Sequence, residues 1–91
     1  SDVLEPFPAL VNQRFDTWLA QYEVEQGAFS DEKRVWLQRI KDQIANNAEF
    51  EMDDFEMIPA CKEEGGLLKA QSLFGKDLPV IVQELNGYLI A

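Results

Sequence analysis

Apolar residues recur at helical spacing in three stretches of this chain, and this periodicity constrains the fold more than any other feature. Between residues 9 and 26 they fall at i, i+4, i+7, i+8 and i+11 and make one helix face: Val11, Phe15, Trp18, Leu19 and Tyr22. Residues 30–47 carry a second such face: Trp36, Leu37, Ile40 and Ile44. Residues 77–91 carry a third and broader one: Leu78, Ile81, Val82, Leu85, Tyr88 and Leu89. The sequence therefore predicts three long helices.

The second predicted helix has the clearest start. Ser30 is of the residue type that caps a helix N-terminus, and Asp31 and Glu32 follow in the first turn, where the helix dipole favours anions. Phe29 precedes the cap and is placed to pack near Val35 as a hydrophobic staple. We expect this helix to end at the adjacent pair of asparagines, because asparagine is a poor helix former.

Glycine and proline mark the other boundaries of the long helices. The two prolines of VLEPFP predict an extended entry segment over residues 1–8, because proline does not fit a helix interior. Gly27 is expected to end the first helix. Asp77 is the expected N-cap of the last helix, and Pro79 lies in its first turn, where a missing N–H group costs little.

The stretch EEGGLLKAQSLFG contains three of the five glycines of the chain. Between them the apolar residues have helical spacing over only about two turns, and an isolated helix that short is unstable in water. Such a helix requires Leu67 and Phe74 to be buried against neighbouring elements. Gly65 and Gly66 allow a tight turn into the helix, and Gly75 is expected to be a left-handed C-cap.

The segment between the second helix and the paired glycines interrupts the helical spacing. Phe50–Met52 alternates apolar and acidic side chains, which predicts a short extended piece and the only candidate strand. Asp53 is then expected to cap one helical turn that carries Phe55 and Ile58. Pro59 is expected to end that turn, and a loop to run on to the glycines. The expected architecture is a small all-α domain over residues 1–91, with three longer helices and one or two short ones.

The charge balance limits the direct partners of the domain. Seventeen acidic and eight basic residues, with no histidine, give a net charge of −9. An acidic field repels phosphate, which disfavours nucleic acids and anionic membranes. The balance suits a module that meets a basic protein surface, or one that simply stays soluble. The basic residues of the second helix alternate with acids, which is more typical of a solvated helix face than of a DNA footprint.

The sequence contains no recognisable catalytic or metal-binding pattern. Without histidine, Ser–His and Cys–His nucleophile systems are absent. Cys61 lies near Glu63 and Glu64, which are expected to raise its pKa. The acids between residues 49 and 64 do not fit the register of an EF-hand, so a solvated acidic loop is favoured over a weak cation site. The glycines do not form a phosphate-binding loop. We therefore expect no catalytic residue, metal ligand or cofactor site.

The single cysteine and the first residues of the chain indicate the cellular compartment of the protein. Cys61 is the only cysteine, so an intrachain disulfide is impossible, and we expect a reducing, cytoplasmic compartment. No apolar run approaches the roughly 20 residues that span a bilayer. The first residues lack the pattern of a signal peptide. They read like a start cut from a longer chain, with processing of an intact small protein as the alternative.

Three motif-bearing stretches follow one another in a recognisable order. They are RFDTWLAQ (14–21), FSDEKRVWLQRIKDQIANNAEFEMDDF (29–55) and GGLLKAQSLFGKDLPVIVQELNGYL (65–89). The motifs within them are F-x-x-W-L, W-L-x-x-I-[KR]-[DE]-x-I-A, G-G-L-x-[KR]-A-x-x-L-F-G and E-L-N. In this order and at these separations they resemble the extreme C-terminal domain of the R (restriction) subunit of type I restriction–modification enzymes.

The chain departs from the pattern of that family at three places. Lys33 or Arg34 stands where the family has glutamine, and Gln43 stands where it often has histidine. Ala60 or Cys61 stands where the family has an aromatic residue after the proline. None of these differences removes a catalytic group, because the catalysis of the family lies elsewhere in the subunit.

The resemblance implies a non-catalytic domain of a much larger, bacterial subunit. The intact subunit carries a nuclease and a pair of motor domains that translocate DNA with ATP and magnesium, so the parent would be a type I site-specific deoxyribonuclease. The C-terminal domain is implied to help dock that subunit onto the methyltransferase and specificity subunits. DNA would then be contacted only through the whole complex.

We expect partner contacts at exposed aromatic side chains of the first helix and at the acidic loop: Trp18, Tyr22, Glu49, Glu51, Asp53 and Asp54. A second set is expected to hold the fold: Trp36, Gly65, Gly66, Leu67, Phe74 and Gly75. Two alternatives remain open. In the first, the domain packs on the motor domains of its own subunit and stiffens them. In the second, it contacts DNA directly, which its acidic charge disfavours.

Overall fold

The computed structural model describes residues 7–46 and 48–90 and contains only helices and connections within them. Its elements are α1 (Phe7–Gln26), α2 (Asp31–Ala45), η1 (Met52–Glu56), α3 (Pro59–Glu63), α4 (Gly66–Phe74), η2 (Gly75–Asp77) and α5 (Leu78–Ile90), where η denotes a 3-10 helix. The prediction of a small all-α fold is confirmed. In the described part of the chain, no helix is long and apolar enough to cross a membrane.

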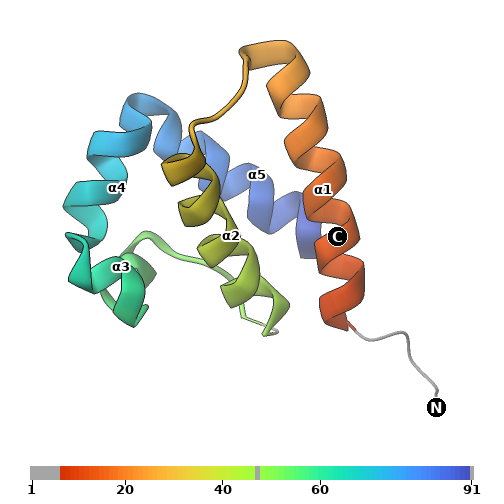
Figure 1. Ribbon diagram of the computed structural model, residues 1–91. Helices are drawn as coiled ribbons and strands as arrows, with labels where there is room; N and C mark the ends of the chain where they lie inside the picture. Colours follow the sequence, from red (N-terminus) through yellow and green to blue (C-terminus); the bar gives the residue numbers. More distant parts are fainter. Residues whose placement is uncertain (1–6, 47, 91) are drawn as a thin grey trace.

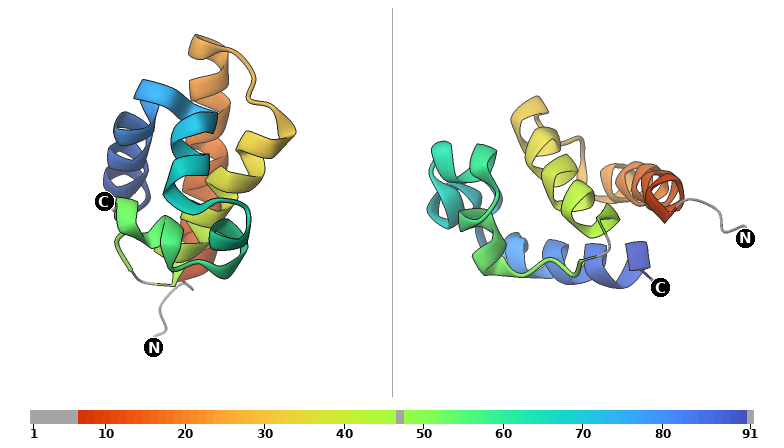
Figure 2. Two further views of the ribbon diagram at one scale, coloured as in Figure 1. Left: turned by 90° about the vertical axis from the view of Figure 1, so that its left-hand side faces the viewer. Right: turned by 90° about the horizontal axis from the view of Figure 1, so that it is seen from below.

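The last helix packs against α1, α2 and α4, and α3 and η1 pack against α4. α1 and α2 lie side by side, and α5 passes behind α2 from the end of α4 to α1 (Figure 1). Seen from below, α5 lies along one edge of the molecule, with α1, α2 and the α3–α4 pair arranged beside it (Figure 2). The core therefore lies between α5 and the helices that cross it.

The three predicted stripes form this core. Leu19 and Tyr22, toward the end of the α1 stripe, are half-buried and pack against it. Tyr88 remains 40% exposed because it lies at the edge of the α5 stripe. The other members are buried: Val11, Phe15, Trp18, Trp36, Leu37, Ile40, Ile44, Leu78, Ile81, Val82, Leu85 and Leu89. The helical periodicity thus identified most of the core.

The first helix begins earlier than the prolines indicated. Phe7 and Pro8 are already helical, so the predicted extended segment is wrong for these two residues, and residues 1–6 lie outside the described part. Pro8 is the second residue of α1. Its missing N–H has no partner in a first turn in any case, and its fixed φ suits a helix.

The boundaries of α2 agree with the sequence. Ser30 is extended, and its hydroxyl accepts a hydrogen bond from the Lys33 N–H at 3.2 Å. Asn46 caps the other end. Phe29, however, packs against other aromatic rings, and Val35 is left 43% exposed. The expected staple on Val35 is thus replaced by a contact between helices.

The residues around Phe50 are extended but form no strand. The Asn86 side chain on α5 accepts a hydrogen bond from the Phe50 N–H at 2.8 Å and donates one to the Phe50 carbonyl at 2.7 Å. One amide thus satisfies both backbone groups, which a neighbouring strand would otherwise do. Glu51 is extended as expected, but Met52 already belongs to η1, so the expected extended piece is shorter than Phe50–Met52 and the candidate strand is wrong.

The turn and loop predicted after this point are also corrected. Glu51, rather than Asp53, is the N-cap residue of η1, and the Asp54 carboxylate accepts a hydrogen bond from the Glu51 N–H at 2.8 Å. Pro59 does not end a turn but opens α3, because proline is well suited to the first position of a helix. The expected loop to the glycines is therefore largely helical.

The last two boundaries differ in detail from their predictions. Gly75 ends α4 with φ +58° and ψ −139°, so its φ is positive as expected, but its ψ is not that of a left-handed helix. Asp77 belongs to η2, which runs directly into α5, and so it is not the extended N-cap that was predicted. Gly27 ends α1 as expected, with its N–H donating to the Glu23 carbonyl.

Candidate functional site

The paired glycines form a turn that closes around a carboxylate. Gly66 has φ +60°, and the Glu56 carboxylate accepts a hydrogen bond from the Leu67 N–H at 2.8 Å. A Cβ atom at Gly66 would collide with that carboxylate. Glu56 thus satisfies a backbone donor of the first turn of α4, where the helix dipole favours an anion. The role of the pair is to hold the fold.

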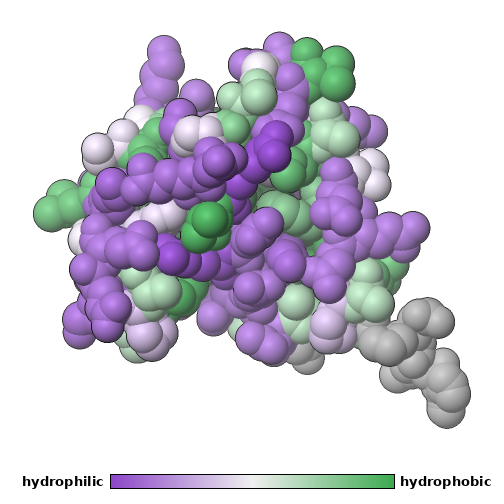
Figure 3. Space-filling view, in the orientation of Figure 1, coloured by the Kyte–Doolittle hydropathy of each residue, from purple (hydrophilic) through white to green (hydrophobic). Residues whose placement is uncertain are grey.

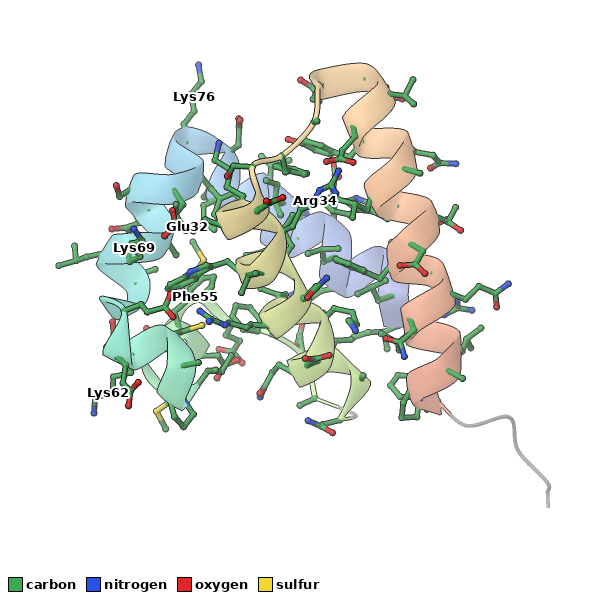
Figure 4. All side chains as sticks on the ribbon, in the orientation of Figure 1. Glu32, Arg34, Phe55, Lys62, Lys69 and Lys76 are labelled. Carbon is green, nitrogen blue, oxygen red and sulfur yellow. The ribbon has the colours of Figure 1, made fainter. Side chains whose placement is uncertain are left out.

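Trp36 is the centre of a second structural cluster. It is fully buried, and its ring lies 5.7 Å from the Phe55 ring, which Figure 4 shows between α2 and the α3–α4 side. The Arg39 guanidinium lies over the Trp36 ring at 5.4 Å and donates two hydrogen bonds to Glu64, at 3.1 and 3.2 Å. The hydrogen bonds from Arg39 lower the pKa of the Glu64 carboxyl. This cluster fastens α3 to α2.

The E-L-N motif on α5 also consists of residues that hold the fold. Glu84 accepts a hydrogen bond from Trp18 Nε1 at 3.1 Å, and Leu85 is fully buried. The Asn86 amide forms hydrogen bonds with both backbone groups of Phe50. Glu84 thus connects α5 to α1, Asn86 connects it to Phe50, and Leu85 lies in the core.

The aromatic side chains expected on the surface of α1 are not exposed. Trp18 is only 6% exposed, and the expectation that it presents a surface is wrong. It lies on the core side of α1 between the rings of Phe15 and Tyr22. Tyr22 is half-buried and stacks on Phe29 at 5.0 Å. Helical periodicity placed both residues on the apolar stripe, which was the correct signal.

Cys61 is a poor candidate nucleophile. The thiol is fully buried in the core, and this burial raises its pKa, with a smaller contribution from Glu64, while Arg39 acts in the opposite direction. The sequence had attributed the raised pKa to the neighbouring acids. Within residues 7–46 and 48–90, no group of three or more acidic or cysteine side chains is arranged to hold a metal ion.

Several basic side chains are engaged with acids. Among residues 7–46 and 48–90 the ion pairs include Arg34–Glu23 at 2.7 Å, Arg39–Glu64 at 3.1 Å, Lys41–Asp42 at 3.0 Å and Lys69–Glu32 at 3.0 Å. Figure 4 shows Lys69 directed toward Glu32, whereas Lys62 and Lys76 point outward at opposite ends of the α3–α4 side. The cations are therefore either engaged or dispersed.

The segment 48–56 has no such neutralisation. Its apolar residues Phe50 and Phe55 are buried, and this turns three acidic side chains outward: Glu49, Glu51 and Asp53. Asp54 is half-buried and Glu56 is exposed, and both accept backbone hydrogen bonds. No basic side chain of the described chain forms an ion pair with any of these acids. We call Glu49, Glu51 and Asp53 the acidic edge.

A shallow groove of about 250 Å³ lies beside this segment. One wall is a single face of α2 with residues at i, i+3, i+4 and i+7: Arg39, Asp42, Gln43 and Asn46. The other wall is the link between η1 and α3: Met57, Ile58 and Pro59. Sequence reasoning missed this groove because its walls come from separate elements, although the run of Met57, Ile58 and Pro59 was visible in the sequence.

Comparison with known proteins gave one finding. The family model described as EcoEI R protein C-terminal matches residues 1–90. The comparison with curated proteins and the comparison with solved structures gave no match.

Proposed function

The chain belongs to the EcoEI R protein C-terminal family and is thus an R-subunit domain of a type I restriction enzyme, and from that premise we propose that it docks the subunit onto its methyltransferase–specificity core. In this proposal the domain does no chemistry of its own. The nuclease, the ATP-driven motor and the magnesium sites belong to other parts of the subunit. The domain supplies a surface that the core complex recognises.

The acidic edge is the observation that carries the proposal. Glu49, Glu51 and Asp53 are exposed and form no ion pair with a basic side chain within the described residues. Adjacent carboxylates of one sign attract a basic surface and penalise an acidic one. A protein complex built to hold DNA is rich in basic side chains, so its surface complements this edge.

The distribution of apolar surface supports an electrostatic mode of docking. Figure 3 shows the hydrophobic residues of one face as separate patches among hydrophilic side chains. The large exposed apolar side chains also come from different elements, such as Val24 on α1 and Leu68 on α4. On that face there is no continuous apolar surface of the kind that drives obligate assembly.

Co-elution from a sizing column with the cognate methyltransferase–specificity complex tests the proposal. The test variant combines Glu49→Lys, Glu51→Lys and Asp53→Lys, and it leaves Asp54 intact because the Asp54 carboxylate accepts the backbone hydrogen bond from Glu51 at the start of η1. We expect the native chain to co-elute at low salt and the test variant to be lost from the complex. Circular dichroism confirms that each chain is folded.

The matched control reverses three exposed acids elsewhere: Asp16→Lys, Glu25→Lys and Asp77→Lys. Each reversal changes the charge by +2, so both variants go from −9 to −9 + 6 = −3. Co-elution of the control but not of the test variant supports docking through the acidic edge. Failure of the native chain to co-elute, together with binding to the motor domains of its own subunit, would replace docking with an internal brace.

A further inference from the structure

The groove between α2 and the Met57–Pro59 link is already shaped in the unbound chain. The Met57 and Ile58 N–H groups donate to the Asp54 carbonyl at 2.9 and 3.0 Å, and the Lys62 N–H donates to the Ile58 carbonyl at 2.9 Å. These bonds fix the link on η1 and α3. A wall that is ordered before binding loses little conformational entropy when a partner arrives.

The opposite wall is also held in place. Arg39 is fixed by its two hydrogen bonds to Glu64 and by its position over Trp36. Its charge is therefore engaged on the side of α3. Because the Arg39 guanidinium is already paired with Glu64, it repels an incoming cation less than an unpaired guanidinium would.

The size and lining of the groove fit a side chain. Its volume of about 250 Å³ is below the roughly 300–1,000 Å³ of pockets that hold whole small molecules. Met57 at its margin is 75% exposed, and methionine is flexible enough to adapt to different apolar partners. Ile58 and Pro59 continue the apolar wall, whereas the α2 wall is polar. A segment whose apolar side chain contacts Met57–Pro59 and whose backbone polar groups face α2 matches this lining.

The charge beside the groove determines what carries that side chain. The chain leaves the α2 wall after Asn46 and returns to the groove at Met57, so residues 48–56 connect the two walls. That connection carries the acidic edge, which forms no ion pair within the described residues. Because the acidic edge lies on the segment that joins the two walls, lysine or arginine flanking the anchor complements its carboxylates.

We propose that this groove seats one aliphatic or aromatic anchor side chain from a basic segment of the methyltransferase–specificity core, with flanking lysine or arginine residues on the acidic edge. The inference rests on the proposed docking function and locates its contact. The two features have different roles in binding: the acidic edge attracts the segment, and the groove fixes its position. The anchor then contributes mainly to the lifetime of the complex and the charges to its rate of formation.

Two matched substitutions test the anchor without changing charge. Met57→Ser removes the apolar margin of the groove, and Leu68→Ser removes an equally exposed apolar side chain from α4, since the two are 75% and 78% exposed. The affinity of each 91-residue chain for the methyltransferase–specificity complex is measured by calorimetry. We expect Met57→Ser to weaken binding about tenfold and Leu68→Ser less than about twofold.

Photo-crosslinking identifies the occupant directly. p-Benzoylphenylalanine is placed at position 57 or at position 68, and the crosslinked peptides of the core complex are sequenced by mass spectrometry. The expected result is a crosslink from position 57 to a peptide that holds an apolar residue flanked by lysine or arginine. Equal crosslinking from both positions, or a crosslink to an acidic peptide, would overturn the proposal.

The outcomes separate this inference from the docking function on which it rests. If the acidic-edge variant loses binding but Met57→Ser binds as tightly as the native chain, docking stands and the groove is not its contact. If the native chain does not bind the core complex at all, both proposals fail. If Met57→Ser and Leu68→Ser weaken binding equally, the contact is not specific to the groove.

Discussion

Asn86 shows how one side chain can replace an element of secondary structure. Its amide satisfies both backbone groups of Phe50, which lies 36 residues away in the sequence, and also donates to the Val82 carbonyl at 3.1 Å. Phe50 is only 1% exposed, so water has little access to replace these bonds. The amide therefore fixes the start of the segment that carries the acidic edge.

Removing that amide is expected to destabilise the domain strongly. Asn86→Ala leaves two backbone groups of a buried residue without partners, and we expect it to lower the free energy of unfolding by about 2–4 kcal/mol. Gln83→Ala, at an exposed position of the same helix, is expected to change it by less than about 0.5 kcal/mol. Urea denaturation measures both. Equal effects would show that Asn86 acts only through helix propensity.

Two glycines are expected to respond to alanine with opposite signs. Gly66→Ala should destabilise the chain by about 2 kcal/mol or more, because φ is +60° there and the new Cβ would displace the Glu56 carboxylate. Gly87→Ala should stabilise it by about 0.5–1 kcal/mol, because Gly87 lies inside α5 with open space around it. Thermal unfolding of both variants measures the difference. Destabilisation by Gly87→Ala would contradict this interpretation.

At the scale of elements, Glu23 connects α1 to α2 across their short turn. Its carboxylate accepts a hydrogen bond from the Phe29 N–H at 2.7 Å and pairs with Arg34 at 2.7 Å. The backbone hydrogen bond from Phe29, followed by the hydrogen bond from Arg34, lowers the pKa of Glu23 below its usual value of 4.5. The ionised form is thus favoured in the folded chain.

This lowered pKa predicts a specific acid dependence. Because the folded pKa lies below the unfolded one, the contribution of Glu23 to stability is present above the unfolded pKa and is lost as the pH falls through the folded value. Glu23→Gln should destabilise the chain at pH 7 and make the loss of stability between about pH 5 and pH 3 less steep.

Urea denaturation across this pH range checks the prediction, with Glu25→Gln as the control from the same helix. Glu25 is exposed and makes neither of the two contacts of Glu23. If the free energy of unfolding depends on pH in the same way in the native and Glu23→Gln chains, the turn is held by packing alone.

The sequence predicted those elements whose signals are local. The stripe of α2 and the Ser30 cap lie within a few residues of one another, and both were identified correctly. Pro59 was misjudged because the same residue type ends one helix and opens another, and only the following residues decide between them. The candidate strand failed because the partner of Phe50 is a side chain on α5.

The candidate site was predicted only in part, for the same reason. The acids at positions 49, 51 and 53 were visible in the sequence, and their exposure accompanies the burial of the neighbouring Phe50 and Phe55. The groove was not visible, since it joins α2 to the Met57–Pro59 link. Trp18 was taken for a surface residue although its spacing already placed it on the core stripe.

At the scale of the whole molecule, the arrangement of charge matters more than its sum. Seventeen acids against eight bases leave many carboxylates without a cation. Within the described residues the ion pairs lie on α1, α2 and α4 and at the end of α3, whereas residues 48–56 hold several acids and no basic residue. The segment 48–56 keeps its charge uncompensated. The account of docking depends on this local excess.

The most direct test of docking is the salt dependence of binding to the methyltransferase–specificity complex. Dissociation constants are measured by calorimetry from about 50 to 300 mM NaCl, a range over which screening of exposed charges becomes stronger. Binding of the native chain should weaken as salt rises. The acidic-edge variant should bind at least about tenfold more weakly at low salt, and its affinity should depend less on salt. The Asp16, Glu25 and Asp77 reversals should keep most of the native affinity and slope. Native binding that does not respond to salt, or equal losses in the two variants, would contradict the account.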